Sequence, residues 1–183
     1  MDKGIDGYRR FLSGDEAGLE EIIAYYKDGM ILYLNGIVQD FYFAEEMVEE
    51  TFVKLVVKKP HFSEEASFKT WLYTIGRNTA LDGLRKGKRS DVPLDSLPEL
   101  QDEVCLELAY IQQENKLLIH KCLKKLKPEY RQVLWLLYFE GFSCKQIARI
   151  MRKTTHNVET TAYRARLALK NILIKEGYNN EDQ

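Results

Sequence analysis

The chain has 183 residues, of which 45% are apolar and 30% charged, a balance typical of a globular protein. At ~100–200 residues per domain this length allows one medium domain or two small ones. Its 4 Pro and 11 Gly exclude a collagen-like or low-complexity chain, and no apolar run approaches the ~18 residues that span a bilayer. The N-terminus lacks the apolar segment of a secretory signal, so we expect a cytoplasmic protein without membrane insertion.

The net charge of −1 conceals four blocks of alternating sign. Residues 1–57 and 91–115 each carry a net charge of −7, whereas residues 58–90 carry +5 and residues 116–183 carry +8. Basic blocks favour a polyanionic partner such as nucleic acid. We also expect the free chain to be compact, with the acidic linker and an acidic helix partly covering the basic surfaces. Exposed charge pairs are weak and screened, so this compaction should be sensitive to salt.

Apolar residues recur every three or four positions, which predicts an all-α fold. The expected helices span residues 15–38, 44–57, 67–86, 106–126, 129–139, 143–151 and 154–175. Ser67 is a candidate N-cap, and Pro60 ends the helix before it because proline disfavours helix in the preceding residue. Residues 90–104 contain two prolines and no basic residue. We therefore predict two small helical domains, residues 1–90 and 112–183, joined by a flexible acidic linker over residues 91–111.

The helix expected over residues 44–57 has an acidic face opposite its apolar stripe. This face consists of Glu45, Glu46, Glu49, Glu50 and Val53. Its carboxylates repel one another by tenths of a kcal/mol per pair. The face is either an ordinary solvated surface or a docking site for a basic protein surface, with Val53 as the apolar contact.

On the next helix, Trp71 and Tyr73 lie off the centre of the apolar stripe. Neighbouring polar and basic candidates for DNA contact are Lys69, Arg77, Asn78, Arg85, Lys88 and Arg89. Aromatic rings interleaved with cations suit single-stranded DNA, because bases stack on the rings while cations hold the backbone. The alternative is that both rings are ordinary core aromatics.

Residues 143–175 predict a helix-turn-helix. Ser143 and Gln146 can form a capping box, residues 151–153 make the turn, and Thr154 or Thr155 caps the second helix. The candidate DNA contacts on the turn and the outward face are Arg152, Lys153, Thr155, His156, Asn157, Glu159, Thr160, Tyr163, Arg164 and Arg166. Polar tips flanked by cations suit the major groove. Glu159 is unfavourable near phosphates, so duplex binding by this module alone should be weak.

Histidines and cysteines show no catalytic or metal-ligand spacing. His61, His120 and His156 lie far apart, and Cys105, Cys122 and Cys144 form no CxxC pair. A nucleotide-binding GxxxxGK[ST] signature is also missing from the sequence. We therefore expect no cofactor, no metal and no enzymatic activity, although a helical enzyme or metal protein is one alternative class.

Two blocks of sequence resemble a known family. AEEMVEETFVKL followed by FKTWLYTIGRNTALDGLRKGKR is similar to region 2 of bacterial RNA polymerase sigma factors, and LKPEYRQVLWLLYFEGFSCKQIARIM followed by VETTAYRARLALK is similar to region 4. The short chain, with nothing large between the blocks, resembles the extracytoplasmic-function (ECF) group. Arg152 stands where the family usually has a turn glycine, so promoter sequence is not transferable from relatives.

The resemblance implies a sigma initiation factor that directs core polymerase to promoters. It places the acidic face on the polymerase clamp, residues 58–67 around a flipped promoter base, and residues 68–89 on the melted minus-ten element. Residues 154–166 would read the minus-thirty-five element. The implied partners are the clamp and flap regions of core polymerase, promoter DNA and an anti-sigma factor. The alternative is a stand-alone helix-turn-helix regulator that binds duplex DNA without polymerase.

Overall fold

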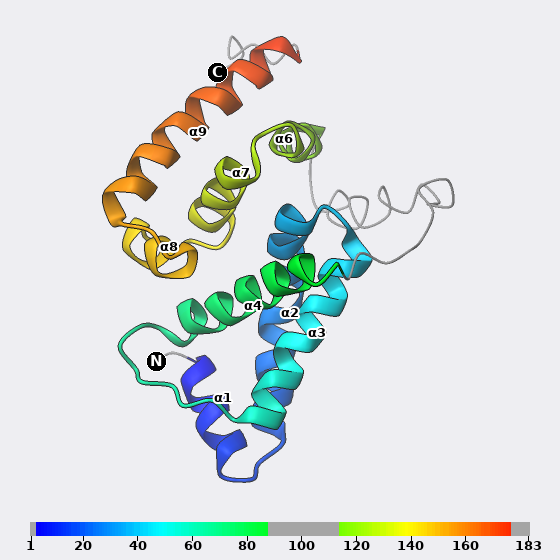
Figure 1. The fold of residues 1–183 in the computed structure, drawn as a ribbon, viewed down its shortest axis with the longest axis vertical. Coiled ribbons are helices and arrows are strands. Elements are labelled where there is room, and N and C mark those ends of the chain that lie inside the picture. The colour runs from blue at the N-terminus through cyan, green and yellow to red at the C-terminus, as the bar shows by residue number, and fades with distance from the viewer. Residues whose placement is uncertain (1–2, 88–113, 177–183) are drawn as a thin grey trace.

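The structure is a computed structural model that describes residues 3–87 and 114–176 (Figure 1). Its N-terminal bundle contains α1 (Lys3–Leu12), α2 (Ala17–Val38), α3 (Phe41–Lys58) and α4 (Phe68–Arg85). Its C-terminal bundle contains α6 (Glu114–Lys124), α7 (Pro128–Leu134), the π-helical turn η2 (Trp135–Phe139), α8 (Cys144–Met151) and α9 (Thr155–Lys175). The described residues contain no strand, so the predicted all-α class is confirmed. No helix among them is long and apolar enough to cross a bilayer.

Three helices begin at caps that the sequence displays. Ser67 accepts a hydrogen bond from the backbone amide three residues later, at 3.2 Å. Ser143 and Gln146 form the expected capping box, in which the Ser143 amide donates to Gln146 Oε1 at 2.9 Å. Thr154, rather than Thr155, caps α9. Each cap satisfies a backbone amide that the first turn of a helix leaves free, so these starts are fixed locally.

Elsewhere the helix boundaries differ from the predicted ones. Helix α3 starts at Phe41, three residues earlier than expected, because the Asp40 side chain caps it. The segment expected as one helix over 129–139 is α7 followed by η2, in which the Glu140 amide donates to the Trp135 carbonyl at 3.2 Å. Helix α1 was not predicted. The predicted linker and the residues 106–113 of a predicted helix lie outside the described residues.

The N-terminal bundle packs α2, α3 and α4 along one another, with α1 against the start of α2 (Figure 1). Met30, Leu34, Met47 and Leu72 are fully buried between them. Helices α1 and α2 cross closely at Gly18, where an added Cβ would meet the backbone of α1. Helix α1 is thus held by tertiary packing. Its apolar residues Ile5, Tyr8 and Phe11 recur every three positions, a helical pattern that the sequence-based prediction missed.

The two bundles contact each other directly. Helix α8 lies against α4, and α7 lies against α2. At the junction the ring of Phe142 meets the ring of Tyr73 edge-on, with centroids 5.2 Å apart. The C-terminal bundle therefore covers part of the α4 surface.

Candidate nucleic-acid interface

The acidic face of α3 is largely open to solvent. Glu45 pairs with Lys27 of α2 at 3.7 Å, and Glu50 pairs with Lys54 one turn along at 3.2 Å. Glu46 and Glu49 are exposed and have no ion-pair partner among the described residues. An apolar strip continues the face beyond the predicted residues, formed by the exposed side chains Val53, Val56 and Val57. Carboxylates beside exposed valines can accept a basic surface that also has an apolar contact.

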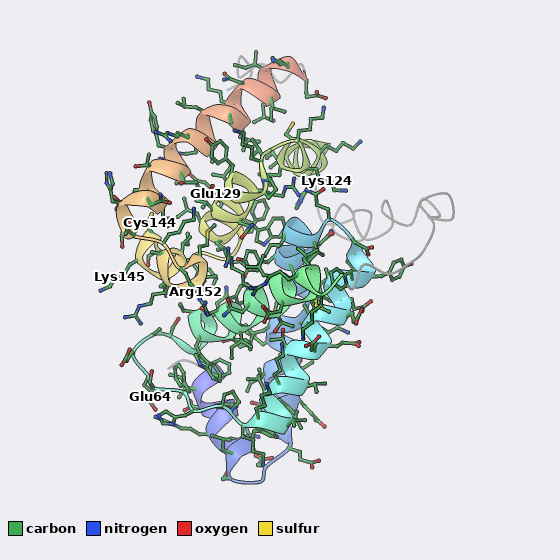
Figure 2. All side chains as sticks on the ribbon, viewed as in Figure 1. Glu64, Lys124, Glu129, Cys144, Lys145 and Arg152 are labelled. Carbon is green, nitrogen blue, oxygen red and sulfur yellow. The ribbon has the colours of Figure 1, made fainter. Side chains whose placement is uncertain are left out.

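Trp71 belongs to an aromatic cluster at the start of α4. Its ring lies 5.2–5.4 Å from the rings of Tyr8, Phe62 and Phe68, and it is half-buried. The Tyr8 hydroxyl donates to the Pro60 carbonyl at 2.7 Å, which ties the loop between α3 and α4 to α1. Figure 2 shows Glu64 on this loop, where it pairs with Arg9 at 2.5 Å. Trp71 lies in the first turn of α4, next to this tethered loop, and the exposed part of its half-buried ring could stack on a base.

Lys69 and Tyr73 both bind Glu140 of the C-terminal bundle. Lys69 Nζ lies 2.9 Å from Glu140 Oε2 and donates to the Glu140 carbonyl at 2.8 Å. The Tyr73 hydroxyl donates to Glu140 Oε2 at 2.7 Å. Burial, and then the adjacent carboxylate, raise the pKa of Tyr73 well above its usual range. The Tyr73 side chain is only 1% exposed, so of the two alternatives left open by the sequence, the structure favours an ordinary core aromatic. The C-terminal bundle completes a core around it.

The remaining predicted residues of α4 differ in their surroundings. Arg77 Nε donates to Gln132 Oε1 of α7 at 3.2 Å, and Asn78 is half-buried. Arg85 is exposed and pairs with Asp82 in its own helix. Lys88 and Arg89 lie outside the described residues. The acidic linker and the acidic helix were expected to cover part of the basic surfaces. Among the described residues, Lys69 instead meets Glu140 and Phe142 in the turn after η2, and Arg77 meets Gln132 of α7.

The second helix of the predicted helix-turn-helix presents a nearly uncovered polar face. Its buried stripe is formed by Val158, Ala162 and Ala165. Most of the predicted contacts on it are exposed, namely Thr155, His156, Asn157, Glu159, Tyr163, Arg164 and Arg166, and Thr160 is half-buried. Only Arg166 among them donates a side-chain hydrogen bond, to the Tyr138 hydroxyl at 3.2 Å. This face can enter a groove without rearrangement.

Two sequence families match the two bundles. "Sigma-70 region 2" matches residues 22–90, and "Sigma-70, region 4" matches residues 116–169. The chain belongs to the sigma-70 family of RNA polymerase sigma factors. This confirms the resemblance noted from the sequence.

Its relatives and structural neighbours agree with this membership. ECF RNA polymerase sigma factor SigM of Bacillus subtilis is 27% identical, over 89% of this chain and 99% of that protein. RNA polymerase sigma-H factor of Pseudomonas aeruginosa is 28% identical, over 90% of each chain. The fold matches CnrH, solved in complex with the cytosolic domain of CnrY, with a TM-score of 0.67 and 22% identity over 95% of this chain and 97% of that one.

In region 4, the turn between α8 and α9 carries an arginine in a glycine-like conformation. Arg152 has a φ of +54° and lies at the end of α8 (Figure 2). A residue with a side chain loses roughly 1–2 kcal/mol of stability in this left-handed conformation, whereas glycine adopts it without that cost. The Arg152 side chain is exposed, and its neighbour Lys153 pairs with Glu129. The sequence predicted the turn but not this backbone cost.

Sequence reasoning missed the polar residues that join region 2 to region 4. Arg131 is 6% exposed and donates to the carbonyls of Leu123, Lys124 and Leu126 at the end of α6, at 2.8–3.1 Å. Its remaining guanidinium nitrogen donates to the Gly36 carbonyl of α2 at 3.1 Å. Burial lowers the pKa of Arg131. Nothing in the local pattern distinguishes this arginine, or Glu140, from the surface charges nearby.

The described residues contain no cluster of ligands that could hold a metal ion. His120 instead packs on Trp135 and Phe139, with ring centroids 5.5 and 5.4 Å away, and burial lowers its pKa. Cys122 is buried and Cys144 half-buried, while Cys105 lies outside the described residues.

Proposed function

We propose that this sigma-70 family protein binds core RNA polymerase, directs it to specific promoters and helps to melt the minus-ten region. The observation that carries the proposal is the pairing, in one chain, of a region 2 helix bearing Lys69, Trp71 and Arg77 with a region 4 helix whose polar face is exposed. One set of side chains suits unpaired bases and the other suits a duplex groove. Neither set of side chains alone could both recognise duplex promoter DNA and bind the separated strand.

Each surface takes a distinct part. The α3 face docks on the polymerase clamp through Glu46, Glu49 and Val53, since these are the members least occupied by contacts within the chain. Region 4 contacts the flap and places α9 on the minus-thirty-five duplex. On α4 and the preceding loop, Trp71 stacks on bases of the separated strand. The process is binding without covalent chemistry, and stacking offsets the few kcal/mol that each extruded base costs.

An anti-sigma protein is the further partner that we propose. CnrH was solved with the cytosolic domain of CnrY, and RpoE of Bartonella quintana, with a TM-score of 0.62 to this chain, was solved with the anti-sigma factor NepR. Helix α9 here exposes Tyr163, Leu167 and Ile174, which are large apolar side chains available to a protein partner. Such a partner would compete with polymerase or promoter.

Reconstitution with core polymerase tests the proposal. Core alone, the chain alone and the two together are incubated with fragmented genomic DNA of the source cell, and run-off transcripts are sequenced. We expect discrete start sites only when both proteins are present. A stand-alone regulator would instead retain specific duplex fragments without core and would create no start sites. That result would overturn the proposal.

A further inference from the structure

Glu140 follows η2 in region 4, yet its carboxylate lies among groups of region 2. It accepts a hydrogen bond from the Tyr73 hydroxyl at 2.7 Å and pairs with Lys69 Nζ at 2.9 Å. The indole of Trp135, in its own bundle, donates to the other carboxylate oxygen at 3.4 Å. The Glu140 side chain keeps only 10% of its exposure. A carboxylate so placed is held by charge, by hydrogen bonds and by exclusion of water.

A glycine in α2 makes room for this carboxylate. A Cβ added at Gly29 would lie 3.0 Å from Glu140 Oε1 and 3.0 Å from the Tyr73 hydroxyl. Glycine is less favourable than alanine in a helix interior, so Gly29 lowers the stability of α2. In exchange it leaves space for the Glu140 carboxylate. The fit depends on all three elements together: α2, α4 and the turn after η2.

Other contacts between the bundles surround the same α4 surface. Arg77 binds Gln132, Gln146 Nε2 donates to Ser67 Oγ at 3.4 Å, and Arg149 donates to the Glu65 carbonyl at 2.5 Å. Lys69 Nζ also lies 4.9 Å from the ring centroid of Phe142. Residues of region 4 thus bind the Lys69 ammonium and the Arg77 guanidinium of α4. Under the proposed function, these two groups would otherwise contact DNA.

We propose that Glu140, with Lys69, Tyr73 and Gly29, forms an intramolecular latch that keeps the nucleic-acid face of α4 closed in the free chain. The inference rests on the proposed function, because it assigns that face to DNA. In the latch the Glu140 carboxylate satisfies the Lys69 ammonium in place of a nucleic-acid phosphate. Binding of single-stranded DNA to α4 then requires region 4 to move away, and only ligands that favour the open arrangement, such as core polymerase, release it.

The burial of this pair changes the expected response to salt. Lys69 and Glu140 keep 29% and 10% of their side-chain exposure, so mobile ions screen their attraction less than that of a surface pair. The closed arrangement should therefore persist at salt concentrations that dissociate exposed charge contacts. This differs from the salt-sensitive compaction expected from the charge blocks of the sequence.

Two variants open the latch by different routes, and a third is their control. Glu140→Gln removes the carboxylate charge. Gly29→Ala changes no charge and places a methyl group against Glu140 and Tyr73. Glu20→Gln matches the first variant in net charge at an exposed position of α2 that forms no ion pair among the described residues. Small-angle scattering gives the radius of gyration, and fluorescence anisotropy with a labelled oligo(dT) gives the affinity for single-stranded DNA, both without polymerase.

We expect Glu140→Gln and Gly29→Ala to increase the radius of gyration and to tighten oligo(dT) binding about tenfold, as for a competent state rising from about a tenth of the population. The wild type and Glu20→Gln should be compact and alike. An extended wild type, or variants that expand without tighter binding, would overturn the latch. Core-polymerase affinity of the same variants is measured separately. If no form binds core, the proposed function fails, while the scattering result still decides whether Glu140 closes the molecule.

Discussion

Helices α4 and α9 are both proposed to meet promoter DNA, but they differ in what their polar side chains do in the free chain. On α4, Lys69, Tyr73 and Arg77 are bound to groups of the C-terminal bundle. On α9, His156 and Tyr163 are exposed, as are most of the polar residues around them. The polar face of α9, proposed to read the duplex, is therefore exposed in the free chain. The polar residues of α4, proposed to bind the separated strand, are instead covered by the C-terminal bundle, which also carries α9.

This difference separates the two steps of promoter use within one chain. A duplex contact through the outward face of α9 would break at most the hydrogen bond from Arg166 to Tyr138, and we expect Glu159 to keep that contact weak. A strand contact through α4 needs the loss of a buried ion pair and of several hydrogen bonds between the bundles, which is costly without replacement partners. Core polymerase and melted DNA together supply such partners. The following predictions break or sharpen this comparison.

The largest effect is expected from the α3 face, because under the proposed function docking of this face on polymerase is the step that uncovers α4. Glu46→Lys with Glu49→Lys should weaken core binding by ~100-fold or more, since like charges brought together at an interface cost several kcal/mol. Folding should be unchanged, as both side chains are exposed. Titration of labelled core measures the affinity. The control is Glu20→Lys with Asp28→Lys, which makes the same charge change on α2 and should retain wild-type affinity.

Trp71→Ala distinguishes strand contact from duplex contact. Loss of one stacking platform, worth about 1–3 kcal/mol per base, should reduce open complexes by ~10-fold or more. Closed complexes, which rely on α9, should form normally. Permanganate reactivity of promoter thymines reports the first and a gel-shift assay reports the second. Tyr25→Ala removes an exposed ring from α2 and serves as the control. Equal loss in both assays would make Trp71 a core residue of its aromatic cluster.

Arg152→Gly changes the turn that precedes α9, and it tests both the backbone strain there and the contribution of Arg152 to duplex binding. Glycine relieves the positive φ at the end of α8, so the free energy of unfolding should rise by about 1 kcal/mol. If the exposed guanidinium contacts a phosphate, the slope of duplex affinity against salt should fall by about one unit. Urea denaturation and salt titrations measure the two quantities. Arg152→Lys, which keeps the charge and the strain, should show neither change.

The smallest effect concerns His120 in the C-terminal bundle. Burial lowers its folded-state pKa, so the unfolded chain binds the proton more readily. Stability is therefore full above the unfolded pKa near 6.5 and declines as the pH falls through the folded value. Between pH 7.5 and 5.5 this group should lower the melting temperature by no more than about 2 °C. His120→Phe should remove that part of the pH dependence and leave the rest.

Features set by neighbouring residues could be read from the sequence. The caps at Ser67 and Ser143 depend on spacing within one helix and appear as predicted, and of the two candidates for the α9 cap it is Thr154. The stripe expected from the spacing of Val158, Ala162, Ala165 and Leu169 is buried at its first three positions and half-buried at Leu169. Contacts between distant segments could not be read. The pairing of Glu140 with Lys69 spans 71 residues, and no local pattern marks either partner.

The candidate DNA-binding residues also divide into those whose exposure follows from one helix and those whose exposure depends on a distant segment. Exposure along α9 follows from helical period, and the predicted outward residues are in fact outward. The burial of Tyr73 depends on a second bundle packing on α4, so helical period alone could not decide between a core and a surface position for this ring. Which of these residues touch polymerase or DNA stays a prediction.

The central claim, that α4 is covered in the free chain and uncovered on polymerase, is tested most directly by the distance between the bundles. Spin labels are placed at Ser13→Cys, after α1, and Lys170→Cys, on α9, with Cys105, Cys122 and Cys144 replaced. Both labelled positions are exposed and away from Glu140. Double electron–electron resonance should give one narrow distance for the free chain and a longer one with core polymerase. A broad distribution in the free chain, or the same narrow distance with and without core, would contradict the claim.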